Sequence, residues 1–302
     1  MLFDGALGTM LIARGLTLGR PPEQWNLEQP SSVREVHAAY LEAGAEVIGT
    51  NTFGGSPGRL SSFGLGKDAG KINTAGVLLA KSAVAEAGRG ESTGGAGQPE
   101  QHSPGQRTAP RFVAFSIGPT GKMLSPVGKA APGEIFDEFA AQLLDAGNGY
   151  DLILVETMFD LREALIALAC ARKHASVPVA VTLTFMKNPR GFFTIMGDDP
   201  AVAVRRLEAA GADVVGANCT IASAQMIELA RALRAGTDLP LLCQPNAGQP
   251  RVTEGRPVYD QTPREFANDA LALYAAGVNA VGGCCGTTPR FIQEVAARIA
   301  QH

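Results

Sequence analysis

The regular alternation of strand-like and helix-like segments most limits what this chain can fold into. Short apolar runs, several of them apolar at nearly every position, are typical of strands buried on both faces of a parallel sheet. Eight strands are expected, at Leu2–Asp4, Glu46–Asn51, Arg111–Ile117, Leu152–Glu156, Val179–Thr184, Val214–Asn218, Leu241–Gln244 and Ala280–Gly283. Helices are expected between them, at Ser32–Glu42, Glu134–Gly147, Leu161–His174, Ala201–Ala210, Ala222–Arg234 and Pro263–Ala276, with a last one at Phe291–Ala300.

Three of these helices end in the same way, with an alanine and a glycine directly before the next strand, at Ala43-Gly44, Ala210-Gly211 and Ala276-Gly277. Glycine suits a left-handed helix cap, and short connections of this kind are what a barrel requires. The sequence therefore predicts a single (β/α)8 TIM barrel over residues 1–302. An open doubly wound sheet is the alternative, but Gly5-Ala6-Leu7-Gly8-Thr9 lacks the glycine spacing of a phosphate-binding fingerprint.

The segment Gly88–Pro110 breaks the alternation, because it is rich in Gly, Pro, Ser and Gln and has no apolar periodicity. We interpret it as a disordered insertion within one domain. A linker between two domains is the alternative, and it would cut the barrel after two strands.

Composition excludes several classes of function. The formal net charge of −3 over 302 residues does not provide the excess of positive charge that binding to nucleic-acid phosphates needs. No apolar run approaches the roughly 20 residues that span a bilayer, and Met1-Leu2-Phe3-Asp4 does not resemble a secretory signal. A cytoplasmic location is expected, without membrane or nucleic-acid partners. The five cysteines are then free thiols, metal ligands or nucleophiles rather than disulfides.

Three cysteines stand at the ends of expected strands. Cys219 follows the sixth strand, and Cys284 and Cys285 follow the eighth. Strand ends meet on the catalytic face of such a barrel, and three protein ligands with one open position are typical of catalytic zinc. Adjacent cysteines reach one metal only if the backbone turns sharply, which the glycines at 282, 283 and 286 permit. The alternative is that all three are small buried hydrophobes, as is expected for Cys170 and Cys243.

Four motifs resemble those of the homocysteine S-methyltransferase family: Phe3-Asp4-Gly5-Ala6-Leu7-Gly8-Thr9, Gly49-Thr50-Asn51-Thr52-Phe53, Gly216-Ala217-Asn218-Cys219 and Gly282-Gly283-Cys284-Cys285-Gly286-Thr287-Thr288-Pro289. They extend in order from the first strand to the last helix. Within the family, Ser116–Gly121 and Gln244–Gly248 resemble the homocysteine-binding domain of cobalamin-dependent methionine synthase more than the betaine-using branch. The resemblance implies a TIM barrel, a zinc ion held by the three cysteines, and methyl transfer to homocysteine.

The resemblance also assigns substrate-binding residues. It implies that Asp4 and Glu156 hold the amino group of homocysteine, while N–H groups at Gly5 and Ala6 are suited to its carboxylate. From the residues alone, Asp4 could equally cap the following helix, and Glu156 could pair with Arg162 or Lys187. The resemblance further implies that Asn246 can occupy the open zinc position before substrate arrives. Asn246 could equally be an ordinary turn residue.

The methyl donor is the least determined feature. The barrel accounts for the whole chain, so the preferred donor is methylcobalamin held by a separate module or corrinoid protein and supplied from the methyltetrahydrofolate pathway. A stand-alone enzyme using S-methylmethionine or another sulfonium donor is the alternative. From another class, a non-catalytic structural zinc protein would need a fourth protein ligand and a closed site.

Overall fold

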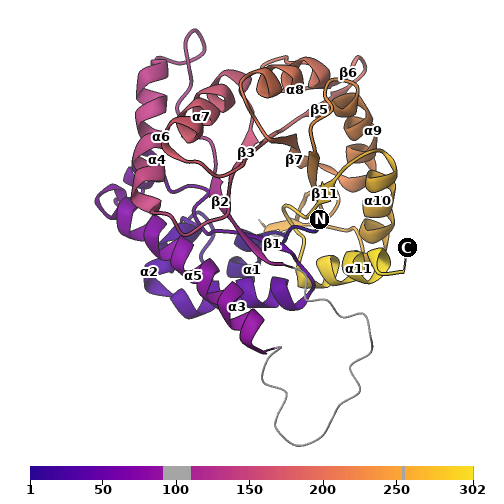
Figure 1. Cartoon of the computed structure of the whole chain (residues 1–302), viewed down its shortest axis with the longest axis horizontal. Helices are drawn as coiled ribbons and strands as arrows, with labels where there is room; N and C mark the ends of the chain where they lie inside the picture. The colour runs from indigo at the N-terminus through magenta and orange to yellow at the C-terminus, as the bar shows by residue number, and fades with distance from the viewer. Residues whose placement is uncertain (91–109, 254–255, 302) are drawn as a thin grey trace, which may run out of the picture.

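A curled parallel sheet forms the centre of the protein (Figure 1). The computed structural model describes residues 1–90, 110–253 and 256–301. The sheet has seven strands in the order β1-β2-β3-β4-β7-β8-β11, and every neighbouring pair is parallel. Their bounds are β1 Val47–Gly49, β2 Phe112–Ile117, β3 Leu152–Met158, β4 Val179–Leu183, β7 Val214–Ala222, β8 Leu241–Asn246 and β11 Ala280–Val281.

The expected first strand, Leu2–Asp4, is present only as isolated bridges. Leu2 bridges Val281 of β11, and Phe3 bridges Val47 of β1, so this segment contacts both edges of the curled sheet. Phe3 N donates to Val281 O (2.8 Å) and Asp4 N to Val47 O (2.9 Å), whereas the N–H of Leu2 donates to the carboxylate of Glu46 (2.7 Å). The α/β class and the parallel arrangement are confirmed, whereas the described sheet has seven regular strands where eight were expected.

Helices surround the sheet (Figure 1). Glycines 44, 211 and 277, which were expected to stop helices, all have positive φ angles, as that interpretation requires. Two antiparallel hairpins, β5–β6 and β9–β10, were not expected from the sequence. The helices are α1 Leu7–Ala13, α2 Trp25–Glu28, α3 Pro30–Glu42, α4 Pro57–Ser61, α5 Ala69–Gly90, α6 Pro132–Ala146, α7 Leu161–His174, α8 Pro200–Ala209, α9 Ser223–Arg234, α10 Pro263–Ala275 and α11 Pro289–Ile299; the hairpin strands are β5 Met186–Asn188, β6 Gly191–Phe193, β9 Arg251–Thr253 and β10 Arg256–Val258.

The core has two parts. The larger apolar cluster packs the sheet against the surrounding helices and includes Cys170 of α7 and Cys243 of β8, both fully buried as expected. A smaller, separate cluster takes one residue from most of the strands and fills the inside of the curl: Phe3, Val47, Ala114, Leu154, Ala180, Leu242 and Ala280. Because side chains alternate between the two faces of a strand, this inner layer closes the interior and leaves room for a cavity only at the strand ends.

The expected insertion Gly88–Pro110 begins too early, because α5 continues to Gly90. Helix propagation from the alanine-rich stretch before it is cooperative and carries the first three residues of the segment into the helix. Residues 91–109 of that expected insertion lie outside the described residues.

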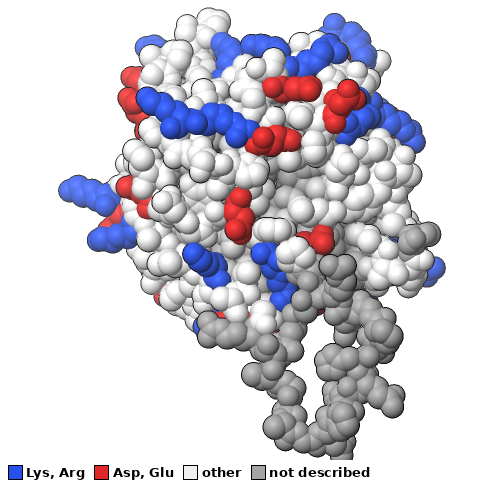
Figure 2. All heavy atoms as spheres, in the orientation of Figure 1, with Lys and Arg blue, Asp and Glu red and all other residues white. Residues whose placement is uncertain are grey.

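Charged side chains of both signs are interspersed on the face seen in Figure 2, in keeping with the small net charge. Within residues 1–90, 110–253 and 256–301, no helix is both long and apolar enough to cross a membrane.

Candidate active site: a cysteine cluster and two carboxyl groups in one cavity

A cavity of about 550 Å³ opens at the carboxyl ends of the parallel strands. It is lined by residues from the first loop, by residues at the ends of β1, β3 and β7, and by the turn after β11. The sequence-predicted residues that meet in its wall are Asp4, Gly5, Ala6, Glu156, Cys219, Cys284 and Cys285. Residues from both ends of the chain therefore share one site.

The three cysteines expected at strand ends do converge. Their Sγ atoms all lie within 4.8 Å of one another, and the Sγ atoms of Cys219 and Cys285 are 3.8 Å apart. Sulfur atoms bound at about 2.3 Å in a tetrahedron would be separated by roughly 3.8 Å, so the spacing fits a zinc ion. All three cysteines are partly exposed, which leaves the cluster open to the cavity.

An irregularity in β7 places Cys219. The pairing of β7 with β8 shifts between Asn218 and Ala222, and Cys219 and Thr220 have φ angles of 61° and 57°. Positive φ angles are uncommon for residues other than glycine and are concentrated at functional sites. The bulge turns Cys219 from the line of the strand toward the neighbouring turn.

A tight turn places Cys284 and Cys285. The N–H of Thr287 donates to the carbonyl of Cys284 (3.1 Å), and Gly286 has a φ of 82°, as the third residue of a type II turn requires. At Gly283 the reason for glycine is space, since a Cβ there would lie 2.4 Å from Thr287 Oγ1. Gly283 and Gly286 thus allow the two adjacent cysteines to lie in one cluster with Cys219.

The three thiols are joined by hydrogen bonds that shift their pKa values in opposite directions. Hydrogen bonds from the side chains of Cys219 and then Cys284 lower the pKa of Cys285 well below its usual value. The hydrogen bond with Cys219 raises the pKa of Cys284 well above its usual value. One thiolate stabilised by neighbouring thiols is the donor set that a thiophilic metal ion would meet.

Asp4 lines the cavity and is 5% exposed. Burial raises the pKa of its carboxyl well above the usual value, against the hydrogen bond that it accepts from Gly49 N (2.9 Å), and nearby Glu156 raises it further. The alternative that Asp4 caps the following helix is wrong, because the N-cap of α1 is Ala6, with no side-chain cap.

Glu156 reaches the same cavity from a bulge in β3, where the pairing with β4 shifts between Val155 and Met158. Its carboxyl accepts hydrogen bonds from Ser116 Oγ and from Asn218 Nδ2 (3.3 Å). The side chain is half-buried, and the loss of water around its carboxyl raises its pKa to about 7. The alternative ion pairs are wrong, because Arg162 pairs with Asp160 and Lys187 with Glu228.

The raised pKa of Glu156 predicts a measurable pH dependence. The folded protein holds a proton on Glu156 up to about pH 7, whereas the unfolded chain releases it near 4.5. The associated stability is complete below the unfolded pKa and is lost as the pH rises through 7. We expect the melting temperature of Glu156→Gln, measured without substrate, to decline less between pH 5 and 8 than that of the wild type. Parallel declines would mean that Glu156 ionises at an ordinary pH.

The two proposed carboxylate donors differ in the structure. Ala6 N–H already donates to Thr287 Oγ1 (3.0 Å), whereas Gly5 N–H has no partner within the described part of the chain. Asn246 ends β8 and is 3% exposed, and its Oδ1 has no hydrogen-bond partner among the described residues. Backbone hydrogen bonds join its neighbours to the cysteine turn, from Cys284 N to Pro245 O (2.8 Å) and from Ala247 N to Cys285 O (3.0 Å).

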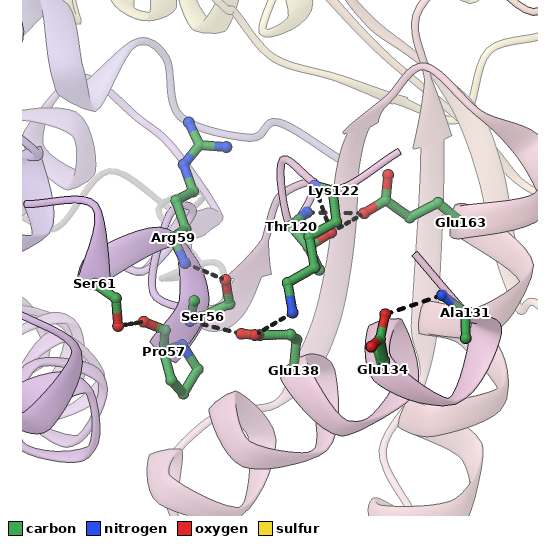
Figure 3. Close-up of polar contacts among 11 residues, drawn as sticks. Ser56, Pro57, Arg59, Ser61, Thr120, Lys122, Ala131, Glu134, Glu138 and Glu163 are labelled. Atoms are coloured by element: carbon green, nitrogen blue, oxygen red, sulfur yellow. Dashed lines mark hydrogen bonds and ion pairs between the residues drawn. The ribbon is translucent and has the colours of Figure 1, made fainter. Parts of the chain in front are cut away.

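Sequence reasoning did not identify the outer part of the cavity. Glu23, Phe53 and Arg59 line it; Arg59 lies over the Phe53 ring (5.2 Å to its centroid) and donates to Pro119 O (3.0 Å). Thr120 of the adjoining loop donates through both its N–H and its hydroxyl to the buried Glu163 of α7 (Figure 3). The Gly49–Phe53 motif and the Gly-Pro-Thr-Gly motif were the signals for this region, but no spacing rule links either to the cysteines.

A curled parallel α/β sheet with an open cluster of thiols at its strand ends defines a TIM-barrel-like protein equipped to bind a thiophilic metal. Comparisons with known proteins go further. The family model for homocysteine S-methyltransferase matches residues 1–299. The chain therefore belongs to the homocysteine S-methyltransferase family, which confirms the resemblance inferred from its motifs.

Two curated relatives are methionine synthases. That of Mycobacterium tuberculosis is 32% identical over 315 residues, and that of Mycobacterium leprae is 31% identical over 316 residues. The alignments cover 99% and 100% of this chain, which spans only about a quarter (24%) of the length of either relative.

Among solved structures, the metallated form of the homocysteine methyltransferase MmuM from Escherichia coli superposes with a TM-score of 0.76 and 25% identity, covering 99% of this chain and 96% of that one. The carboxyl transferase domain of Rhizobium etli pyruvate carboxylase, with a TM-score of 0.52, 15% identity and coverage of 98% and 47%, shares the fold alone.

Proposed function

We propose that this chain transfers a methyl group to the thiol of homocysteine, giving methionine, with a zinc ion held by Cys219, Cys284 and Cys285. One observation carries the proposal: the cysteine cluster, the buried carboxyl of Asp4 and the half-buried carboxyl of Glu156 line the same cavity. A metal held by the cysteines suits a thiol, and the two carboxyl groups suit an ammonium group. Homocysteine carries both groups in one small molecule.

Each residue contributes by its chemistry. When bound, zinc supplies Lewis acidity that keeps the homocysteine sulfur as a thiolate near neutral pH, where a free thiol with a pKa of about 8.5 is mostly protonated. Asp4 and Glu156 accept hydrogen bonds from the substrate ammonium. Desolvation holds the pKa of both carboxyl groups above normal in the absence of substrate. The positive charge of the arriving ammonium then favours the ionised form of each carboxyl. Ser116 and Asn218 hold the Glu156 carboxylate in place.

The substrate carboxylate is assigned to the first loop, at Gly5 and Ala6. With Ala6 N–H engaged by Thr287, Gly5 N–H is the better available donor of the two. Asn246 is assigned to the open zinc position in the absence of substrate, since its buried Oδ1 has no partner among the described residues and its neighbours are bonded to the cysteine turn.

Methylcobalamin carried by a separate module or corrinoid protein is the proposed donor. The chain corresponds to about a quarter of the methionine synthases that it matches, which leaves the donor to other parts of such a protein or to a partner. A sulfonium compound such as S-methylmethionine is the second candidate, because MmuM is a homocysteine methyltransferase whose chain is matched over 96% of its length. A structural zinc site is disfavoured, because the metal-capable group found among the described residues has only three members and faces a cavity.

The decisive test is zinc-edge X-ray absorption of the purified protein with and without homocysteine. We expect one zinc per chain and one additional sulfur ligand when homocysteine is present. Incubation of the loaded protein with methylcobalamin and, separately, with S-methylmethionine then distinguishes the donors by methionine formed. A protein that takes up no zinc, or whose zinc coordination does not change when homocysteine is added, would contradict the proposal.

A further inference from the structure

Two loops from opposite ends of the chain form one hydrogen-bonded unit at the wall of the cavity. The first contains Asp4, and the second is the cysteine turn. Gly283 N donates to Asp4 O (2.9 Å), Gly286 N donates to Thr9 Oγ1 (3.2 Å), and Ala6 N donates to Thr287 Oγ1 (3.0 Å). The first loop, together with the start of α1 at Thr9, is therefore hydrogen-bonded to the cysteine turn at three points.

Thr287 is the side chain at the centre of this unit. It is fully buried, and its hydroxyl accepts the hydrogen bond from Ala6 N while donating to Cys284 O (2.7 Å). One hydroxyl thus joins the first loop to the carbonyl of a cysteine in the cluster. Valine has nearly the same shape but can make neither bond.

The surroundings of Thr287 leave it little freedom. A Cβ at Gly5 would lie 2.5 Å from Thr287 Oγ1, and one at Gly283 would lie 2.4 Å from it, so both loops approach this hydroxyl as closely as glycine allows. The hydroxyl of Tyr40, a fully buried residue of α3, lies 3.3 Å from Ala6 O and 3.2 Å from Thr287 O. The hydroxyl of Tyr40 therefore lies within hydrogen-bonding distance of both segments.

We propose that Thr287, supported by Tyr40, is a positioning residue that fixes the separation between the cysteine cluster and Asp4, and so selects homocysteine over cysteine. The two amino acids have the same ends and differ by one methylene between the α-carbon and sulfur. A rigid separation accommodates one length, whereas a loosened one accommodates both. This inference rests on the proposed function, because it takes the cluster and Asp4 as the two ends of the substrate site.

The test compares the zinc-loaded full chain with the Thr287→Val, Thr287→Ser and Tyr40→Phe variants. Affinities for homocysteine and for cysteine are measured by calorimetry, together with zinc content. One methylene is worth roughly 10–200-fold in discrimination, and we expect wild type to prefer homocysteine within that range. Thr287→Val should keep its zinc, but its ratio of homocysteine affinity to cysteine affinity should be at least about fivefold lower than that of wild type. Thr287→Ser, which retains the hydroxyl, should have an affinity ratio close to that of wild type.

A purely structural role would lower the melting temperature without changing the ratio of the two affinities. An unchanged ratio in folded Thr287→Val would overturn the inference, as would a serine variant no better than valine. If the valine variant does not fold, Tyr40→Phe decides, since it leaves the Thr287 hydroxyl in place and should lose preference in the same direction. Wild-type protein that binds no homocysteine would instead overturn the proposed function itself.

Discussion

Replacing Cys219, Cys284 or Cys285 by alanine is expected to abolish both zinc binding and methyl transfer. The Sγ atoms lie within 4.8 Å of one another, so each replacement removes one of only three thiols in the cluster. Losing a residue that hydrogen-bonds to a metal ligand typically costs about 10–100-fold in metal affinity. Losing a ligand itself should therefore cost more than about 100-fold. Zinc is measured by elemental analysis after dialysis, and activity by methionine formed. Alanine keeps the Cβ, so the strained backbone at Cys219 is not relieved.

Cys170→Ala and Cys243→Ala are the matched controls. Both thiols are fully buried in the larger apolar cluster, away from the cavity, and burial raises the pKa of Cys170 to about 11 and of Cys243 to about 12. These variants should keep stoichiometric zinc and activity, with a lower melting temperature from the small space left in the core. Full zinc retention in the double variant Cys284→Ala/Cys285→Ala would show that the metal site has been assigned to the wrong residues.

The convergence of the three cysteines could be predicted because the order of strands in a parallel α/β sheet relates sequence position to spatial position. Cys219 was expected after one strand and the Cys284–Cys285 pair after the next but one; in the structure Cys219 lies at the bulge of β7, the pair follows β11, and β8 lies between these strands. Glycines mark the sharp turn, and Gly286 has the positive φ that the adjacent cysteines require. Periodicity likewise located all seven regular strands of the sheet, because strands buried on both faces are almost wholly apolar.

The bulges could not be predicted from this sequence. Glu156 and Cys219 both leave their strands where the pairing shifts, and Thr157, Cys219 and Thr220 have positive φ angles although none is glycine. Such strain is imposed by tertiary packing and has no local sequence signal. Asn218 of β7 shows the cause, since its Oδ1 accepts a hydrogen bond from Thr157 N (2.8 Å) and its Nδ2 donates to Thr157 Oγ1 (2.7 Å) of β3, across the intervening strand β4.

Contacts across long stretches of chain were also beyond prediction. The bond between Ala6 N and Thr287 Oγ1 joins residues 281 positions apart, and its geometry depends on how the sheet curls. The same curl decides that Leu2 and Phe3 make single bridges to the two sheet edges rather than a regular strand. The hairpins β5–β6 and β9–β10 were missed because each of their strands has only three residues, too few to show a period of two.

The second large effect is expected at the carboxyl groups. Asp4→Asn and Glu156→Gln should each weaken homocysteine binding more than about tenfold while zinc content stays unchanged. Removing one charged partner of a buried ion pair typically costs about 2–5 kcal/mol, and about 1.4 kcal/mol already corresponds to a factor of ten. Glu163→Gln is the matched control. This carboxyl is 1% exposed and bonded to Thr120, but it does not line the cavity, so homocysteine affinity should be retained.

A thiol without an amino group separates recognition of the substrate from damage to the metal site. Such a thiol contacts the cysteine end of the cavity but makes no use of Asp4 or Glu156, so both carboxyl variants should bind it as the wild type does. Calorimetric titration of each zinc-loaded protein with homocysteine and with the simple thiol gives the two affinities. Loss of both affinities together would indicate a disturbed metal site. Homocysteine affinity that survives both substitutions would place the amino group elsewhere in the cavity, and the roles assigned to Asp4 and Glu156 would be wrong.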